Sequence, residues 1–172
     1  CDAITALPPL EIPEKTGYKC RNRIGCLIWG DEHFGTEFEL YGKKFATPIM
    51  TAALSHIGTF HPESPNGMVH YAQGAKEVGV VHWIGMGSDE EFEAVINTGA
   101  PTIRIIKPYA DVEKIYGMIR CAEKNGALAV GMDIDHMFDL KGNKDICMGE
   151  EMEIKSSAKL QEYIKSTNLP DL

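Results

Sequence analysis

The strongest constraint on the fold is an alternation of strand and helix patterns that repeats four times. Short apolar runs predict buried strands at "PIMTAA", "VVHWIG", "TIRIIKP" and "ALAVGMDID". Each run is followed by a segment with helical periodicity, and such alternation predicts a parallel sheet with helices outside it. We therefore expect four parallel strands, adjacent in chain order, near residues 48–53, 80–85, 102–107 and 127–133.

Capping signals mark the boundaries of the helices. Ser88, followed three residues later by Glu91, is a capping box. In the helix before it, Ser64 is the predicted N-cap, Pro65 takes the first helical position and Gly79 ends the helix. The segments "ADVEKIYGMIRCAEKNG" and "SSAKLQEYIKST" predict the third and fourth helices.

Two architectures fit this alternation, a doubly wound sheet and a (β/α)8 barrel. A complete barrel needs roughly 250 residues, and the chain has 172. We predict an α/β fold of the TIM-barrel type, in which residues 48–172 supply the first four βα units. Residues 1–47 form a lead-in with a short hairpin in "TEFELYGKKF". Half a barrel leaves two open sheet edges, so we expect the missing half in the same natural chain, on another fragment or from a partner.

Composition narrows the class of protein. A hydrophobic content of 44% suits one domain with a real core, and a net charge of −8 argues against a nucleic-acid or anionic-membrane surface. No apolar run is long enough to span a bilayer. The five cysteines have irregular spacing and no C-x-x-C, so they predict neither a disulfide framework nor a zinc site. We therefore expect a reducing, cytoplasmic location.

The predicted strand ends point to a ligand site, because both architectures bind ligands at the carboxyl ends of their strands. The residues there are Ala52, Ala53, Leu54, Gly85, Met86, Lys107 and Asp133. Small residues let a flat ligand lie against the backbone, and glycine permits close approach. Lys107 offers a positive charge that suits a phosphate. The alternative is that the small residues only fit a crowded barrel corner.

The stretch "AVGMDIDH" carries an apolar strand directly into Asp133, Asp135 and His136. A metal cluster is one interpretation, but residues at i, i+2 and i+3 of a strand end rarely converge on one ion, so we expect no metal. His136 could act as a proton shuttle, but we favour the interpretation that it is an ordinary polar residue of the loop after the strand. We expect Asp133 to point into the barrel mouth, where Lys107 or another lysine would keep it ionised. The competing interpretation is that Asp133 only fastens the loop.

The order of "ELYGKKFATPIMTAA", "GVVHWIGMGSDEEFEAV", "PTIRIIKPY", "NGALAVGMDIDH" and "SSAKLQEYIKSTNLP" resembles the FMN-dependent α-hydroxy acid dehydrogenase and oxidase family. The resemblance covers about residues 36–172. It implies a (β/α)8 barrel that holds FMN and oxidises a small 2-hydroxy acid by transfer to the flavin. It also implies that the backbone of residues 52–54 lies against the isoalloxazine, and that Gly85 and Met86 lie near the ring or ribityl chain.

The chain departs from the family pattern on three strands. Ala53-Leu54-Ser55 stands where the family usually has Pro-Thr-Ala, "RIIKP" where it has Gln and Tyr, and Asp133-Ile134-Asp135 where it has Thr-Val-Asp. The family's lysine, histidine and arginine of the catalytic site would follow Leu172, so the catalytic residues stay unassigned and we expect these residues alone to be inactive.

The expected partners are a small-molecule substrate, the other half of the barrel and a possible second copy of the chain. Two alternatives stay open, a phosphate-binding barrel without flavin and a noncatalytic half-barrel that assembles with its other half. An absorbance scan separates these interpretations, because only a flavoprotein is yellow.

Overall fold

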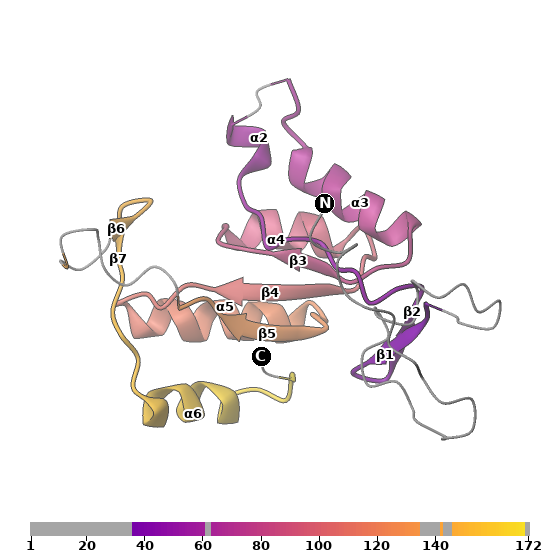
Figure 1. Cartoon of the computed structure of the whole chain (residues 1–172). Helices are drawn as coiled ribbons and strands as arrows, with labels where there is room; N and C mark the ends of the chain where they lie inside the picture. Colours follow the sequence, from indigo (N-terminus) through magenta and orange to yellow (C-terminus); the bar gives the residue numbers. More distant parts are fainter. Residues whose placement is uncertain (1–35, 61–62, 135–141, 143–145, 171–172) are drawn as a thin grey trace, which may run out of the picture. The chain divides into compact units, whose positions relative to one another are not determined.

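Three parallel strands form the central sheet: β3 (His82–Ile84), β4 (Thr102–Ile106) and β5 (Ala129–Met132), in the order β3-β4-β5. The computed structural model describes residues 36–60, 63–134, 142 and 146–170, and all but Thr36 belong to one unit, Glu37–Leu172 (Figure 1). These strands confirm three of the four predicted strands, their parallel direction and their order.

The first predicted strand, near 48–53, is not a regular strand. It pairs with the edge of β3 through two isolated parallel bridges, Met50 with Val81 and Leu54 with Ile84. Between these bridges the first segment has three residues and the facing chain has two. One extra residue on one side is the defining feature of a β-bulge, which interrupts the ladder and bends the chain. We call residues 51–54 the bulged segment.

Helices follow the strand segments as predicted. They are α3 (Gly67–Glu77), α4 (Asp89–Ile96), α5 (Val112–Lys124) and α6 (Ser157–Lys165), with a short α2 (Ile57–Phe60) before them. The capping box is confirmed, because the Ser88 hydroxyl accepts the N–H of Glu91 at 3.2 Å. The cap predicted for α3 is wrong by two residues. Asn66 is the N-cap, and Ser64 instead accepts the N–H of Gly67 with its carbonyl at 2.9 Å. The sequence Ser-Pro-Asn-Gly favours a tight turn, and the helix starts only after it.

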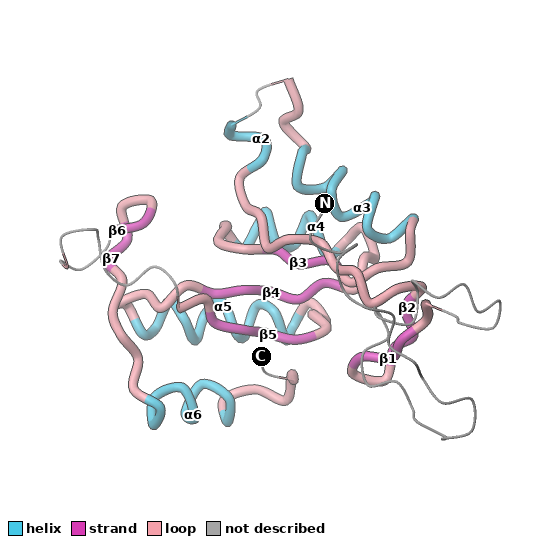
Figure 2. The backbone as a smooth tube through the Cα atoms, viewed as in Figure 1, coloured by secondary structure: helices cyan, strands magenta, loops and turns pink. Residues whose placement is uncertain are grey.

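Two antiparallel hairpins flank the sheet, and Figure 2 shows them at opposite ends of β4. In the first, β1 (Phe38–Leu40) pairs with β2 (Lys43–Phe45), where the sequence predicts a hairpin. In the second, β6 (Ile146–Cys147) pairs with β7 (Glu150–Glu151). The second hairpin lies in a connection for which the sequence predicted no structure. Its turn at Met148 and Gly149 has positive φ angles of 53° and 83°, which an isolated methionine does not signal.

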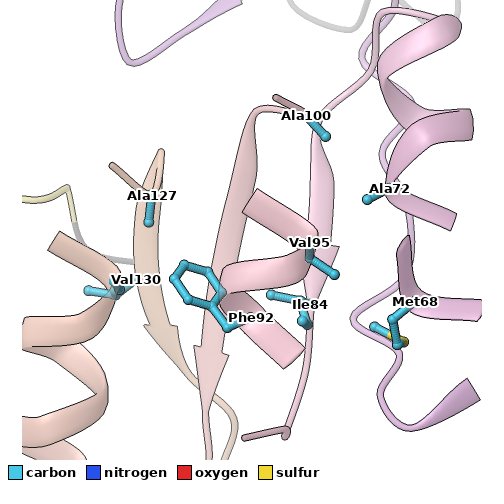
Figure 3. Close-up of a cluster of buried hydrophobic side chains, with 9 residues drawn as sticks. Met68, Ala72, Ile84, Phe92, Val95, Ala100, Ala127 and Val130 are labelled. Carbon is cyan, nitrogen blue, oxygen red and sulfur yellow. The ribbon is translucent and has the colours of Figure 1, made fainter. Parts of the chain in front are cut away.

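Side chains alternate between two faces of the sheet, as the twofold period of a strand requires. On the helix-facing side, residues of α3, α4, β3 and β5 gather in one buried cluster (Figure 3), which includes Met68, Ala72, Ile84, Phe92, Val95 and Val130. On the opposite side, which we call the inner face, Phe45 of the first hairpin packs with Val81, Ile103, Ile105 and Ala129. The sheet is therefore buried on both faces near the amino ends of its strands, as expected for a parallel sheet.

The chain beyond α6 returns to the open edge of the sheet. The N–H of Val130 in β5 donates to the carbonyl of Pro170 at 3.0 Å. This bond places the residues after α6 where the next strand of a barrel would pair. Within the described residues, no helix is long and apolar enough to cross a membrane.

Candidate functional site

The bulged segment lies at the carboxyl end of the sheet edge, and three of its four residues are exposed. Ala52, Ala53 and Leu54 are exposed residues, and the Leu54 side chain is apolar. The carbonyl of Leu54 accepts the N–H of Gly85 at 2.8 Å, and the N–H of Leu54 donates to the carbonyl of Ala52 at 2.9 Å. A tight turn of exposed residues therefore occupies the position where the sequence predicted a ligand-facing strand end.

Gly85 is in close contact with this turn. A Cβ added to Gly85 would lie 2.5 Å from the carbonyl oxygen of Ala53 and 3.4 Å from that of Leu54. Because real Cβ atoms do not approach oxygen so closely, only glycine fits at this position without a shift of the backbone. Two predicted site segments, on different strands, are thus brought into direct contact.

Lys107 and Asp133 form an ion pair at the carboxyl ends of β4 and β5. Lys107 Nζ lies 2.5 Å from Asp133 Oδ2, and the side chains are only 12% and 27% exposed. The N–H of Asp133 donates to the carbonyl of Ile106 at 3.0 Å, so the pairing of the two strands continues to this point. By strand alternation from Ile105 and Ala129, both side chains belong to the inner face. The sequence left open whether Lys107 or a lysine of the other half would compensate Asp133, and Lys107 is paired with it here.

Met86 lies on the other side of the sheet. Its side chain is buried in a helix-facing cluster with Ile106, Tyr109 and Met152, and its Sδ is 3.5 Å from Cys147 Sγ. The sequence predicted that Met86 contacts a flavin ring, but this side chain is directed into the packing between the sheet and the second hairpin. Only its backbone stays at the strand end. Of the other residues in "MDIDH", Asp135 and His136 lie outside the described residues.

Arg104 is a buried charge that sequence reasoning missed. It is 1% exposed, and its Nη2 lies 2.7 Å from Asp89 Oδ1 at the start of α4. Its Nη1 donates to the carbonyl of Met118 at 3.2 Å, and the guanidinium lies 4.5 Å from the centroid of the Phe92 ring. Arg104 therefore joins α4 and α5 to the outside of β4. A charged residue inside the apolar run "TIRII" was the available signal, since a buried charge needs a partner.

Two cavities lie away from the inner face. One, of about 240 Å³, is apolar and lies between β5, α5 and α6, where Ile106, Val130, Leu160 and Tyr163 line it. The other, of about 510 Å³, is lined by Met86, Tyr109, Lys114 and Glu150. Neither includes the bulged segment or the Lys107–Asp133 pair, so neither belongs to the candidate site.

The inner face carries small, exposed residues and one ion pair at the carboxyl ends of its strands. Ala52, Ala53 and Leu54 of the bulged segment are exposed and carry no polar side chain, Gly85 contacts them, and the ion pair adds polar groups at the same end of the sheet. Among the described residues, no group of three histidine, cysteine or carboxylate side chains could hold a metal ion. The polar chemistry available here is that of a paired ammonium and carboxylate beside small, exposed residues.

Comparison with known proteins identifies the family. The sequence matches the FMN-dependent dehydrogenase family over residues 28–170, which is most of the chain. The chain belongs to this family. No curated protein sequence matches it.

Solved structures of mandelate oxidase share the fold. One has a TM-score of 0.65 at 20% identity and covers 80% of this chain and 45% of its own. The structure with (S)-4-hydroxymandelic acid has a TM-score of 0.66 at 18% identity and covers 80% and 47%. The structure with benzoyl-formic acid has a TM-score of 0.65 at 21% identity and covers 80% and 44%. The chain thus spans less than half the length of these enzymes, and its fold is part of a (β/α)8 barrel of their type.

Proposed function

We propose that this chain supplies the first half of a flavoenzyme that binds FMN and oxidises a small 2-hydroxy acid. The observation that carries the proposal is the family match over residues 28–170. The geometry supports it, because an exposed turn, Gly85 and a shielded ion pair all lie at the carboxyl ends of the strands, where barrel enzymes place their sites. Mandelate oxidase, which shares the fold, has been solved with (S)-mandelic acid, with benzoyl-formic acid and with an FMN adduct.

The residues of this chain would bind and orient the cofactor. The exposed turn at residues 52–54 and the backbone of Gly85 would lie against the flat ring, where small residues allow contact over its whole face. When bound, FMN supplies the two-electron chemistry that amino-acid side chains lack. The catalytic base and the group that binds the substrate carboxylate are proposed to come from the second half of the barrel.

The Lys107–Asp133 pair would present a polar, nearly neutral surface to the ligand. A lone ammonium at this position would attract any anion, whereas Asp133 at 2.5 Å offsets most of that charge and fixes its direction. Lys107 would then donate a hydrogen bond to a ring or substrate oxygen, while Asp133 holds the ammonium in place. In this proposal the pair would take the place of the glutamine and tyrosine that the family usually has on the third strand.

The test uses the full-length protein with both halves of the barrel. FMN added to the apo-protein should lose its free fluorescence on binding, and a small 2-hydroxy acid added without oxygen should bleach the visible absorbance of the bound flavin. A protein that binds no FMN would exclude the proposal. A protein that binds FMN but is bleached by none of a panel of aliphatic and aromatic 2-hydroxy acids would exclude the substrate class.

We also propose a cytoplasmic location and assembly into a homo-oligomer. The first rests on the irregular cysteine pattern, and Cys121 and Cys147 are free thiols in the described part of the chain. Cell fractionation tests the location, and sedimentation of the full-length protein tests the assembly. Recovery outside the cytoplasm, or sedimentation as a monomer, would contradict the respective proposal.

A further inference from the structure

Three side chains form a network on the helix-facing side of the bulged segment, one from the segment itself and two from neighbouring elements. We name Thr51, Tyr71 and His82 the bulge network. Thr51 Oγ1 accepts the N–H of Trp83 at 2.8 Å and lies 3.1 Å from His82 Nδ1. The extra residue of the bulge removes the regular ladder partner of Trp83, and the hydroxyl of Thr51 replaces it. The hydroxyl hydrogen of Thr51 is then available to His82 Nδ1.

Tyr71 reaches the same segment from α3. Its hydroxyl oxygen accepts the N–H of Ala52 at 3.0 Å, and the hydroxyl is 3.4 Å from the carbonyl oxygen of Ala52. One side chain therefore contacts both polar backbone groups of the residue that starts the exposed turn. The Tyr71 ring also meets His82 edge-on, with centroids 5.1 Å apart and an interplanar angle of 81°. The helix thus fixes the position of a turn that no regular strand pairing holds.

His82 is the buried member of the network. It is 0% exposed, and within the described residues its Nε2 has no hydrogen-bond partner. Burial lowers the pKa of His82 to about 4, so the ring is neutral near pH 7. A buried polar atom without a hydrogen-bond partner lowers the stability of the fold, whereas an apolar side chain at the same place would not. The other ring nitrogen, Nδ1, does have a partner, the hydroxyl of Thr51, and Thr51 is the first residue of the bulged segment.

We propose that Thr51, Tyr71 and His82 are positioning residues, which set the place of the residue 52–54 backbone against the flavin. They do not reach the ligand side themselves, because their contacts come from behind the turn. The inference rests on the proposed function, since it names the device that shapes the ring-binding surface of that site. The inference predicts that loss of one hydroxyl reduces the affinity for flavin more than it reduces the stability of the fold.

Two variants and two matched controls test the proposal in the full-length protein. Tyr71→Phe and Thr51→Val each remove a hydroxyl from the network. Tyr116→Phe removes one that lies 3.4 Å from Lys159 Nζ between α5 and α6, and Thr102→Val removes one that donates to the carbonyl of Ala100 at 2.8 Å. The measurements are amide hydrogen exchange in the apo-protein, FMN affinity, the visible spectrum of the bound flavin, and Tm.

We expect Tyr71→Phe to speed exchange at the Ala52 amide and Thr51→Val to speed it at the Trp83 amide. Each should weaken FMN affinity about tenfold, the effect of one lost hydrogen bond, and shift the flavin spectrum. Thr51→Ser, which keeps the hydroxyl, should restore the affinity, and the controls should lower Tm without changing affinity or spectrum. Network variants that lower Tm but bind FMN with normal affinity and spectrum would overturn this inference and leave the proposed function standing. A wild-type protein that binds no FMN would overturn the proposed function, and the inference with it.

Discussion

Gly85→Ala tests the contact on which the candidate site is built. The added Cβ would lie 2.5 Å from the carbonyl oxygen of Ala53, about 1 Å closer than an ordinary contact, and it would meet backbone rather than a flexible side chain. Overpacking of this kind costs about 1–3 kcal/mol, which for a domain of 150–250 residues lowers Tm by roughly 2–12 °C. The carbonyl of Ala53 must also move, so the surface proposed to bind the flavin changes shape.

Thermal unfolding and FMN titration of the full-length protein measure both effects. Gly74→Ala is the matched control, because Gly74 lies inside α3 and a Cβ added there would meet nothing within 4 Å. Alanine is better than glycine in a helix by about 1 kcal/mol, so this control should raise Tm and leave FMN affinity unchanged. A Gly85→Ala protein with normal Tm and normal FMN affinity would refute the close approach of Gly85 to Ala53, and with it the basis of the site.

Three further predictions concern charged and titratable groups. The pKa of His82 is lowered from 6.5 to about 4, so its contribution to stability is present above pH 6.5 and is lost as pH falls toward 4. The free energy of unfolding measured in urea should be lower by about 2 kcal/mol at pH 5 than at pH 7, and His82→Gln should lose this part of the pH dependence. Asp133→Asn should reduce turnover or FMN affinity at least about tenfold. Tm should change little, because the asparagine amide oxygen still accepts a hydrogen bond from Lys107. A lower Tm with normal turnover and affinity would show that Asp133 is structural. Asp89→Ala should lower the free energy of unfolding by about 1–3 kcal/mol, because it leaves the buried guanidinium of Arg104 without its ion pair. Arg104→Met, which removes the charge itself, should lower it less. Equal losses for the two variants in urea unfolding would contradict this prediction.

Features that depend on neighbouring residues in the sequence were predictable. The capping box at Ser88 and the left-handed glycine that ends α3, Gly79 with φ 71°, are both present, because each is decided within one turn of helix. The three strands of the sheet follow from apolar runs that are long enough to be buried on both faces. The pairing of Lys107 with Asp133 was predictable from placement, since the ends of adjacent parallel strands must lie close together.

Features that depend on distant contacts were not predictable. The bulge at residues 51–54 needs Tyr71 from α3 and Trp83 from the next strand, and no local pattern in "PIMTAA" signals either partner. Met86 looked like a ligand contact because it ends a strand, but the second hairpin offers Cys147 as its neighbour on the other side. The ligand-facing role of each predicted site residue stays a prediction until a bound flavin is observed.

The most direct test of the central claim is a titration of FMN into the full-length apo-protein, followed by fluorescence and visible absorbance. The chain's membership of the FMN-dependent dehydrogenase family and the backbone surface at Ala52–Leu54 and Gly85 predict saturable quenching of flavin fluorescence. They also predict a yellow protein that keeps its colour through gel filtration. A protein that elutes colourless, with the fluorescence of the added FMN unchanged, would contradict the claim that this half-barrel forms part of a flavin site.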